Sequence, residues 1–333
     1  MNRRTAWTGR DDGPGPAHRR FWSTITDSSS DPVDAALIGF ASEEGVLRNQ
    51  GRAGAVAGPA AIREALASLA VHRPLRVLDA GDVLVENHDL EGGQAELGRR
   101  LAELRTGRVQ RPGRSPDPGA SSPDHPPGGP RPLTGVLGGG HETAWGSYLG
   151  LAGEFADRRL GILNLDAHFD LRQAVAPSSG TPFLQIALDR MVRGASFDYS
   201  VIGISEPNNT TALFDTARQL QATWLRDIDA QTVPEAVAHV DEFVARVDDL
   251  YLTIDLDVMP AAQAPGVSAP AGLGVPAHVI LAAASAAARS GKLRHFDIVE
   301  LNPSCDIDGR TARIAARLVN EILTTAAGRP AGP

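Results

Sequence analysis

Short apolar runs alternate with amphipathic stretches along most of this chain. The apolar runs have the length of buried strands, and they lie at residues 35–40, 75–79, 134–137, 160–165, 199–204, 251–254 and 295–301. Between them, apolar residues spaced by about 3.6 positions predict helices, at residues 58–70, 92–104, 142–156, 182–193, 211–221, 234–247, 276–290 and 311–326. Strands that alternate with helices favour a parallel sheet with helices on both faces, so the predicted fold class is α/β.

Two segments interrupt this alternation. Residues 1–31 are rich in Arg, Asp, Gly, Pro and Ser and predict an irregular N-terminal arm. Residues 107–132 are dominated by Pro, Gly and Ser, so they cannot contribute to a core and predict a disordered surface insert. A functional peptide motif within this insert is the alternative. The length allows one large domain or two, and we predict a single domain over residues 1–333.

Composition narrows the possible functions. The net charge of −8 argues against nucleic acid and acidic membrane surfaces as partners. The sequence has no run of 18 apolar residues, so we expect no membrane-spanning helix. Residues 1–12 are charged and predict no secretory signal, and the single cysteine, Cys305, excludes an intrachain disulfide. We therefore expect a cytoplasmic protein whose partner is a small-molecule substrate, and a homo-oligomer.

Polar motifs follow four of the predicted strands. They are Gly138-Gly139-Gly140-His141-Glu142, Asp166-Ala167-His168-Phe169-Asp170, Asp255-Leu256-Asp257 and Glu300-Leu301-Asn302-Pro303. Ligands bind at the carboxyl ends of the strands in such sheets, so we expect the motifs to converge. On an extended chain, residues two apart point to the same side. We therefore expect the polar residues at 166, 168 and 170 to share one side, and those at 255 and 257 to do the same.

The first three motifs together offer two histidines and four aspartates. Four carboxylates in one site would repel one another, and two divalent cations would balance their four charges. This ligand set is typical of a hydrolytic centre with two metal ions. Carboxylates with two imidazoles favour Mn(II) over Co, Fe or Zn. The absence of cysteine ligands argues against structural zinc.

Each motif also has a plainer interpretation. The glycine run could be a phosphate-binding loop, but the GxGxxG spacing is absent because Thr143 stands where a glycine would be needed. His141 could cap a helix, the aspartates of residues 166–170 could belong to an ordinary turn, and Glu300 could be an exposed carboxylate. We interpret the remaining histidines as surface or packing residues and Cys305 as an unreactive loop residue.

Taken together, the four motifs resemble the ureohydrolase family of arginases, agmatinases and formimidoylglutamases. The resemblance spans about residues 35–323 apart from the insert, and it implies a three-layer α/β/α fold with a mostly parallel central sheet. It also implies two Mn²⁺ per chain with a hydroxide between them as the nucleophile. One ion would be held by His141, Asp166, Asp170 and Asp255, and the other by His168, Asp166, Asp255 and Asp257, so that Asp166 and Asp255 bridge.

Within this family, five segments resemble the formimidoylglutamases, and they lie at residues 7–14, 48–55, 170–172, 178–183 and 306–313. Agmatinases carry His at the position of Ser179. The segment at residues 203–208 departs from the pattern because it is more acidic and less aromatic than expected.

The resemblance implies hydrolysis of N-formimidoyl-L-glutamate to L-glutamate and formamide in histidine degradation. Asp170 and Glu300 would be catalytic: Asp170 would handle the proton and Glu300 would pair with the formamidinium group. The candidate substrate-binding residues are Arg172, Arg52, Ser179 and Thr181. The alternatives are another ureohydrolase acting on a guanidino compound such as agmatine or guanidinobutyrate, a non-catalytic metal-binding protein on the same scaffold, and a nucleotide-binding module.

Overall fold

The computed structural model describes residues 7–26, 32–106 and 131–327. In these residues nine strands form one sheet, in the order β1-β3-β2-β4-β9-β8-β5-β6-β7, and all neighbours are parallel. The strands are β1 Ile25–Thr26, β2 Ala35–Ala41, β3 Val77–Leu84, β4 Leu133–Leu137, β5 Leu160–Leu165, β6 Asp198–Ile204, β7 Thr223–Arg226, β8 Asp249–Asp255 and β9 Leu293–Val299.

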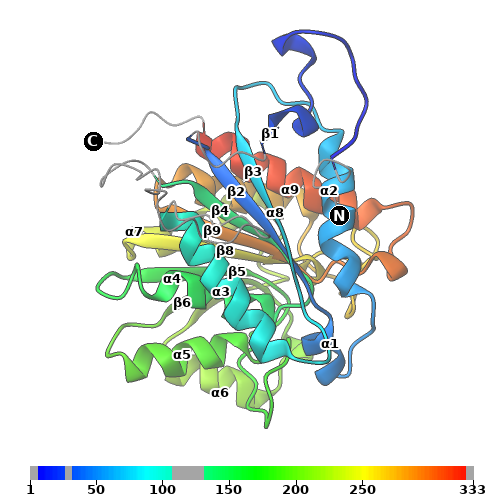
Figure 1. Ribbon diagram of the computed structural model, residues 1–333. Helices are drawn as coiled ribbons and strands as arrows, with labels where there is room; N and C mark the ends of the chain where they lie inside the picture. Colours follow the sequence, from blue (N-terminus) through cyan, green and yellow to red (C-terminus); the bar gives the residue numbers. More distant parts are fainter. Residues whose placement is uncertain (1–6, 27–31, 107–130, 328–333) are drawn as a thin grey trace.

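Helices cover both faces of this sheet (Figure 1). One layer contains α2 Gly58–Ala67, α7 Val233–Ala245, α8 Ala277–Arg289 and α9 Arg310–Ala327, which share one apolar core with the sheet. The other contains α3 Leu90–Thr106, α4 Thr143–Ala152, α5 Pro182–Val192 and α6 Thr211–Gln219. The predicted α/β/α fold with a parallel central sheet is therefore confirmed.

Burial on both faces explains why the strands read as continuous apolar runs. Every residue of β2, β5 and β8 is buried. All seven predicted strands are present, although β3 begins two residues later than predicted and continues to Leu84. The prediction missed β1, β7 and the short helix α1 Glu44–Arg48. The missed strands lie at the two edges of the sheet and are only partly buried, so they lack an apolar run.

The described part of the N-terminal arm packs against the sheet. It contains the 3-10 helices Pro16–His18 and Phe21–Thr24 and the strand β1. Trp7 and Phe21 are buried with their rings stacked 5.8 Å apart, and the Trp7 indole donates a hydrogen bond to Asp79 Oδ2 at 2.6 Å. Residues 107–130 of the predicted insert lie outside the described residues.

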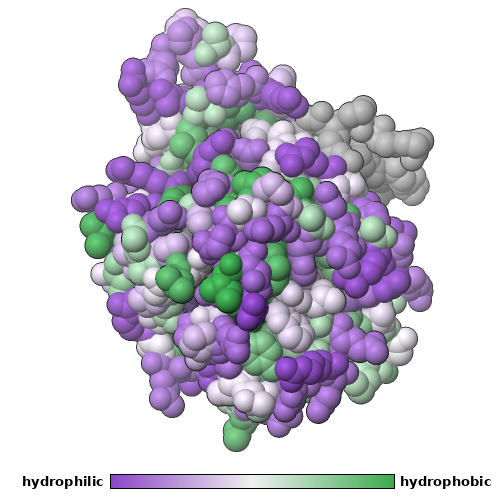
Figure 2. Space-filling model, turned by 180° about the vertical axis from the view of Figure 1, so that it is seen from behind, coloured by the Kyte–Doolittle hydropathy of each residue, from purple (hydrophilic) through white to green (hydrophobic). Residues whose placement is uncertain are grey.

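The surface is mixed in polarity. The face turned away in Figure 1 is covered mainly by hydrophilic side chains, with apolar ones in separate patches (Figure 2). Among the helices of the described residues, none has the length and apolar character needed to cross a bilayer.

Candidate metal centre and substrate pocket

The four polar motifs meet at the carboxyl ends of the four central strands. The chain passes from β4 to His141, from β5 to Asp166, and from β9 to Glu300, while β8 ends at Asp255 itself. These strands lie side by side in the order β4-β9-β8-β5. The predicted convergence of the motifs is therefore confirmed, because the ends of adjacent parallel strands lie at one edge of the sheet.

The local backbone differs from the one predicted. Residues 166–168 form a bend directly after β5, and Asp170 has a φ of 48°. Asp257 lies in a 3-10 turn, and its amide donates to Asp255 Oδ1 at 2.8 Å. The expectation that strand alternation places these side chains on one side is thus wrong, since turns bring them together instead. Glu300 also leaves the strand, because its φ of 67° is incompatible with extended backbone.

His141 faces three carboxylates. Its Nδ1 lies 3.1 Å from Asp166 Oδ2, 3.1 Å from Asp170 Oδ2 and 3.2 Å from Asp255 Oδ2. All four side chains are buried, with Asp170 the most accessible at 9%. Ligand atoms about 2.1 Å from a common ion lie roughly 3 Å apart when the angle between them is near 90°. The spacing around His141 therefore suits a single cation.

His168 stands at a second, adjacent group of oxygens. Its Nδ1 lies 3.4 Å from Asp166 Oδ1 and 3.3 Å from Asp257 Oδ2. Asp166 thus turns one oxygen toward each histidine, as a bridging carboxylate would. The two groups that could each hold a metal ion are His141 with Asp166 and Asp255, and His168 with Asp166 and Asp257. Asp255 belongs to the first of these groups only.

Burial and charge crowding perturb the pKa values of the cluster. Burial raises the pKa of Asp255 well above its ordinary value, and the charges of Asp257 and Asp166 raise it further. Burial opposes charge on His141, yet the surrounding carboxylates raise its pKa well above 6.5. Burial likewise opposes ionisation of Asp166, but contacts with both histidines lower its pKa overall. The cluster therefore requires positive charge, which protons or bound cations can supply.

Two buried atoms in the cluster support cations over protons. His141 Nδ1 and Asp257 Oδ1 have no hydrogen-bond partner among the described residues. Buried polar atoms are normally hydrogen-bonded, so these atoms call for a ligand. Nitrogen and carboxylate donors without thiolate suit Mn and similar divalent metals.

Thr253 and Phe183 orient the imidazole of His141. Its Nε2 lies 3.0 Å from Thr253 Oγ1, so the ring directs Nδ1 toward the carboxylates. The ring of Phe183 contacts the imidazole edge-on at 5.1 Å. Thr253 was not predicted to be functional, although it lies in β8 only two residues before Asp255.

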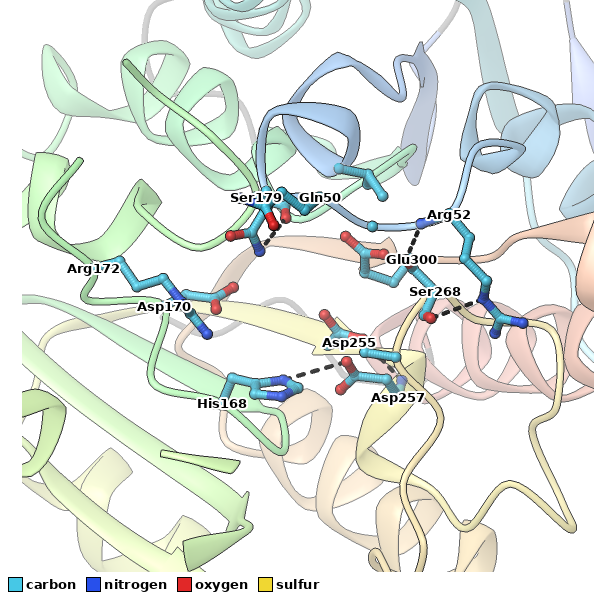
Figure 3. A pocket seen from close by; sticks show the side chains of 14 residues that line it. Gln50, Arg52, His168, Asp170, Arg172, Ser179, Asp255, Asp257, Ser268 and Glu300 are labelled. Carbon is cyan, nitrogen blue, oxygen red and sulfur yellow. Dashed lines mark hydrogen bonds and ion pairs between the residues drawn. The ribbon is translucent and has the colours of Figure 1, made fainter. Parts of the chain in front are cut away.

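A cavity of about 310 Å³ opens beside the cluster. Ten of its lining side chains are labelled in Figure 3, including His168, Asp170, Asp255, Asp257 and Glu300. Burial raises the pKa of Glu300 well above its ordinary value, and the nearby charges of Glu142 and Asp257 raise it further. Glu300 Oε1 accepts a hydrogen bond from the His141 amide at 2.9 Å, which fixes the carboxyl between the metal ligands and the cavity.

Two arginines lie on opposite sides of this cavity (Figure 3). Arg172 is exposed, and no side-chain hydrogen bond or ion pair to another described residue occupies its guanidinium. Arg52 donates from Nε to Ser268 O at 3.0 Å and from Nη2 to Val267 O. Arg172 is therefore free to bind an anion, whereas Arg52 is partly engaged with the loop beside it.

The other two predicted substrate-binding residues differ in placement. Ser179 lines the cavity and accepts a hydrogen bond from Asn49 Nδ2 at 3.1 Å. Thr181 is not among the lining residues, and its hydroxyl donates to Ser178 O at 3.0 Å. Thr181 thus stabilises the loop that carries Ser179 and does not face the cavity.

Three polar lining residues, Asn49, Gln50 and Ser268, were not predicted from the sequence. Asn49 and Gln50 belong to the segment at residues 48–55 that resembles the formimidoylglutamases, and this was the only available signal for them. Gln50 has a φ of 63°, an uncommon conformation for a residue other than glycine, which often marks functional sites.

Comparisons with known proteins find relatives that span nearly the whole chain. The model of the arginase family matches residues 33–324. A formimidoylglutamase from Rhodococcus jostii (strain RHA1) is 50% identical over 326 residues, covering 96% of this chain and 94% of the relative. A formimidoylglutamase from Nocardia farcinica (strain IFM 10152) is 47% identical over 331 residues, covering 98% of each chain.

Solved structures show the same fold. The crystal structure of Trypanosoma cruzi formiminoglutamase with Mn²⁺₂ superposes with a TM-score of 0.77 at 23% identity, covering 94% of this chain and 99% of that one. Arginase from Bacillus subtilis superposes with a TM-score of 0.69 at 21% identity, covering 89% and 99%.

Proposed function

The chain belongs to the arginase family, and we propose that it hydrolyses N-formimidoyl-L-glutamate to L-glutamate and formamide, a reaction of histidine degradation. The observation that supports this proposal is that one cavity combines metal ligands, an acidic residue and two arginines. A cluster of buried histidine and aspartate ligands meets a glutamate, Glu300, at the wall of a pocket that also presents Arg172 and Arg52. Such a pocket fits a substrate with a cationic amidine and two carboxylates.

The residues of the cluster would hold two Mn²⁺ ions. We propose that His141, Asp166, Asp170 and Asp255 hold one ion, and that His168, Asp166, Asp255 and Asp257 hold the other. The facing oxygens of Asp166 support its role as a bridge. When bound, the two ions would lower the pKa of a water molecule and so supply a nucleophile near neutral pH.

Asp170 and Glu300 would act on the substrate. Both line the cavity, and both have the left-handed backbone conformation that turns their carboxyl groups toward it. Glu300 would pair with the formamidinium group and hold its carbon beside the nucleophile. As water adds to this carbon and the bond to the glutamate nitrogen breaks, Asp170 would pass one proton from the water to the leaving nitrogen.

The arginines would bind the glutamate part of the substrate. A guanidinium can form two parallel hydrogen bonds to a carboxylate, and the free guanidinium of Arg172 is the better placed of the two. A polycationic substrate such as agmatine would meet like charge at both arginines. The pocket therefore favours the dicarboxylate over a polycation such as agmatine.

A substrate panel tests this proposal. Purified protein loaded with Mn²⁺ would be incubated with N-formimidoyl-L-glutamate, agmatine, arginine and guanidinobutyrate, and formamide and urea would be measured separately. We expect formamide from the first substrate and little urea from the others. A higher kcat/KM for any guanidino compound would favour the alternative ureohydrolase, and no turnover of any substrate would favour a non-catalytic metal-binding protein.

Two further properties belong to this proposal. We expect the protein to act in the cytoplasm, in keeping with its single cysteine and small-molecule substrate. We also expect a homo-oligomer, which light scattering on the purified protein would test. Neither property is needed for the chemistry assigned to the pocket.

A further inference from the structure

Glu142 is a buried carboxylate beside the metal centre, and the proposed reaction gives it no role. It follows His141 directly, it precedes α4, and its side chain is completely buried. Glu142 is not one of the described residues that line the cavity. Burying a carboxylate costs free energy unless the carboxylate forms hydrogen bonds. The hydrogen-bond partners of Glu142 therefore indicate its role.

The partners of Glu142 lie in the segment that forms one wall of the pocket. Its Oε1 accepts hydrogen bonds from Ser42 Oγ at 2.7 Å and from the Gly45 amide at 3.1 Å. Gly45 lies in α1, and the chain from Val46 to Arg52 provides five of the lining residues. One carboxylate oxygen thus anchors the start of this wall.

Gly45 also connects Glu142 to the opposite wall. Its carbonyl accepts a hydrogen bond from the Ser179 amide at 3.0 Å. The loop around Ser179 in turn holds Arg172, whose amide donates to Gly180 O at 2.9 Å. Hydrogen bonds and short stretches of backbone therefore connect Glu142 through Gly45 to the segments that carry both arginines.

Glycines allow the close approach of Glu142. A Cβ atom on Gly45 would lie 2.4 Å from Glu142 Cδ, and one on Gly140 would lie 2.1 Å from Glu142 Oε2. Contacts this short do not occur between real atoms of these types, so both positions require glycine while Glu142 stays in place. The packing fixes the carboxylate in a single position against the wall.

We propose that Glu142 is a positioning residue that holds the two arginine-bearing walls at the separation needed to bind the glutamate part of the substrate. Glu142 touches neither substrate nor metal in this role. It acts through Gly45, so a change that breaks this contact but keeps the negative charge near Glu300 would weaken recognition of the carboxylates more than it changes the reacting end of the site. This inference rests on the proposed function, because the ligand of the walls is the glutamate moiety.

The test compares a substrate that contains the glutamate moiety with one that lacks it. Glu142→Ala removes both hydrogen bonds, and Glu142→Asp shortens the side chain so that it no longer reaches Gly45. The matched control is Glu154→Ala at the other end of α4, where Glu154 pairs with Arg105 at 2.6 Å. All proteins would be loaded with Mn²⁺ and assayed on N-formimidoyl-L-glutamate and on formamidine, which lacks carboxylates. Binding of L-glutamate would be measured by calorimetry.

For either Glu142 variant we expect KM for N-formimidoyl-L-glutamate and Kd for L-glutamate to rise by about 10-fold, the effect of weakening one charge-assisted hydrogen bond. In Glu142→Asp, which keeps the negative charge near Glu300, kcat and the kcat/KM for formamidine should change by less than about 3-fold, and Glu154→Ala should leave KM unchanged.

Equal losses on both substrates, or unchanged L-glutamate binding in a folded Glu142→Asp protein, would overturn the proposal. The Asp variant serves as the test if the Ala variant does not fold. Failure of the unmodified protein to hydrolyse N-formimidoyl-L-glutamate would instead overturn the proposed function, so the two failures are distinguishable.

Discussion

Replacing Arg172 with alanine tests substrate recognition most directly. The Arg172 side chain is exposed, and its guanidinium forms no hydrogen bond or ion pair with another described residue, so Arg172→Ala should change the free energy of unfolding by less than about 0.5 kcal/mol. A charge-assisted hydrogen bond to a substrate carboxylate contributes roughly 1.5–3 kcal/mol. Since about 1.4 kcal/mol corresponds to a factor of ten, kcat/KM for N-formimidoyl-L-glutamate should fall by roughly 10- to 150-fold.

The assay is steady-state kinetics with Mn²⁺-loaded protein, with metal content measured in parallel. Metal content should not change, and Arg172→Lys should restore only part of the activity because lysine cannot form the two parallel bonds of a guanidinium. Arg218→Ala is a suitable control, since Arg218 is an exposed arginine on α6 that does not line the cavity; its guanidinium pairs with Asp215 and lies over the ring of Phe214. An Arg172→Ala enzyme with unaltered kcat/KM would show that the glutamate end is bound elsewhere.

Three further outcomes are expected. Elemental analysis should find two Mn²⁺ per chain, and activity should disappear with a chelator and return with Mn²⁺. Asp255→Asn should impair both metal sites because Asp255 supplies a central carboxylate, and full activity in metal-free protein would contradict the mechanism. Deleting residues 107–130 and joining Thr106 to Arg131 with a short Gly/Ser linker should leave folded yield and activity unchanged, because long polar loops contribute little to stability; loss of folded protein would refute this. Burial opposes ionisation of Glu154, but Arg105 and Arg131 lower its pKa below the ordinary 4.5, so its stabilising effect should be present above that value and be lost as pH falls below it. The difference in free energy of unfolding between unmodified protein and Glu154→Gln, measured in denaturant, should therefore shrink between about pH 6 and pH 3; a difference independent of pH would exclude this contribution.

The sequence predicts the central sheet well because its strands are buried on both sides. Such strands are continuous apolar runs, as in β5 and β8, and they need no knowledge of their neighbours to be recognised. The edge strand β7 is partly buried along its whole length and therefore has no comparable run. Edge strands are defined by which strand they pair with, and this information lies outside the local sequence.

The candidate metal ligands were predictable for a related reason. They directly follow the strands that position them, so a local motif contains both the strand and the ligand. Strand alternation nevertheless does not place these ligands, because a left-handed backbone conformation positions Asp170 and a 3-10 turn positions Asp257. The residue types identified the site, whereas the backbone geometry depended on tertiary contacts.

The walls of the pocket were the least predictable part. Asn49 contacts Ser179 across 130 positions of the chain, and Arg52 contacts Ser268 across 216. Loops that meet over such distances carry no apolar periodicity, and their polar side chains look like ordinary surface residues. Their function becomes visible only when the sheet has brought them to the same cavity.

The spread of the metal ligands over the ends of three strands, β4, β8 and β5, links metal supply to the lifetime of the protein. His141 after β4 meets Asp166 after β5 and Asp255 at the end of β8, so the complete ligand set exists only when this part of the central sheet is formed. An unfolded chain offers only fragments of this set, and metal ions therefore bind the folded state preferentially. At a free metal concentration 100 times the Kd, such binding adds about 2.7 kcal/mol to the free energy of unfolding. A cell short of manganese would thus lose folded protein as well as activity, because chains without metal unfold more often and become accessible to proteases.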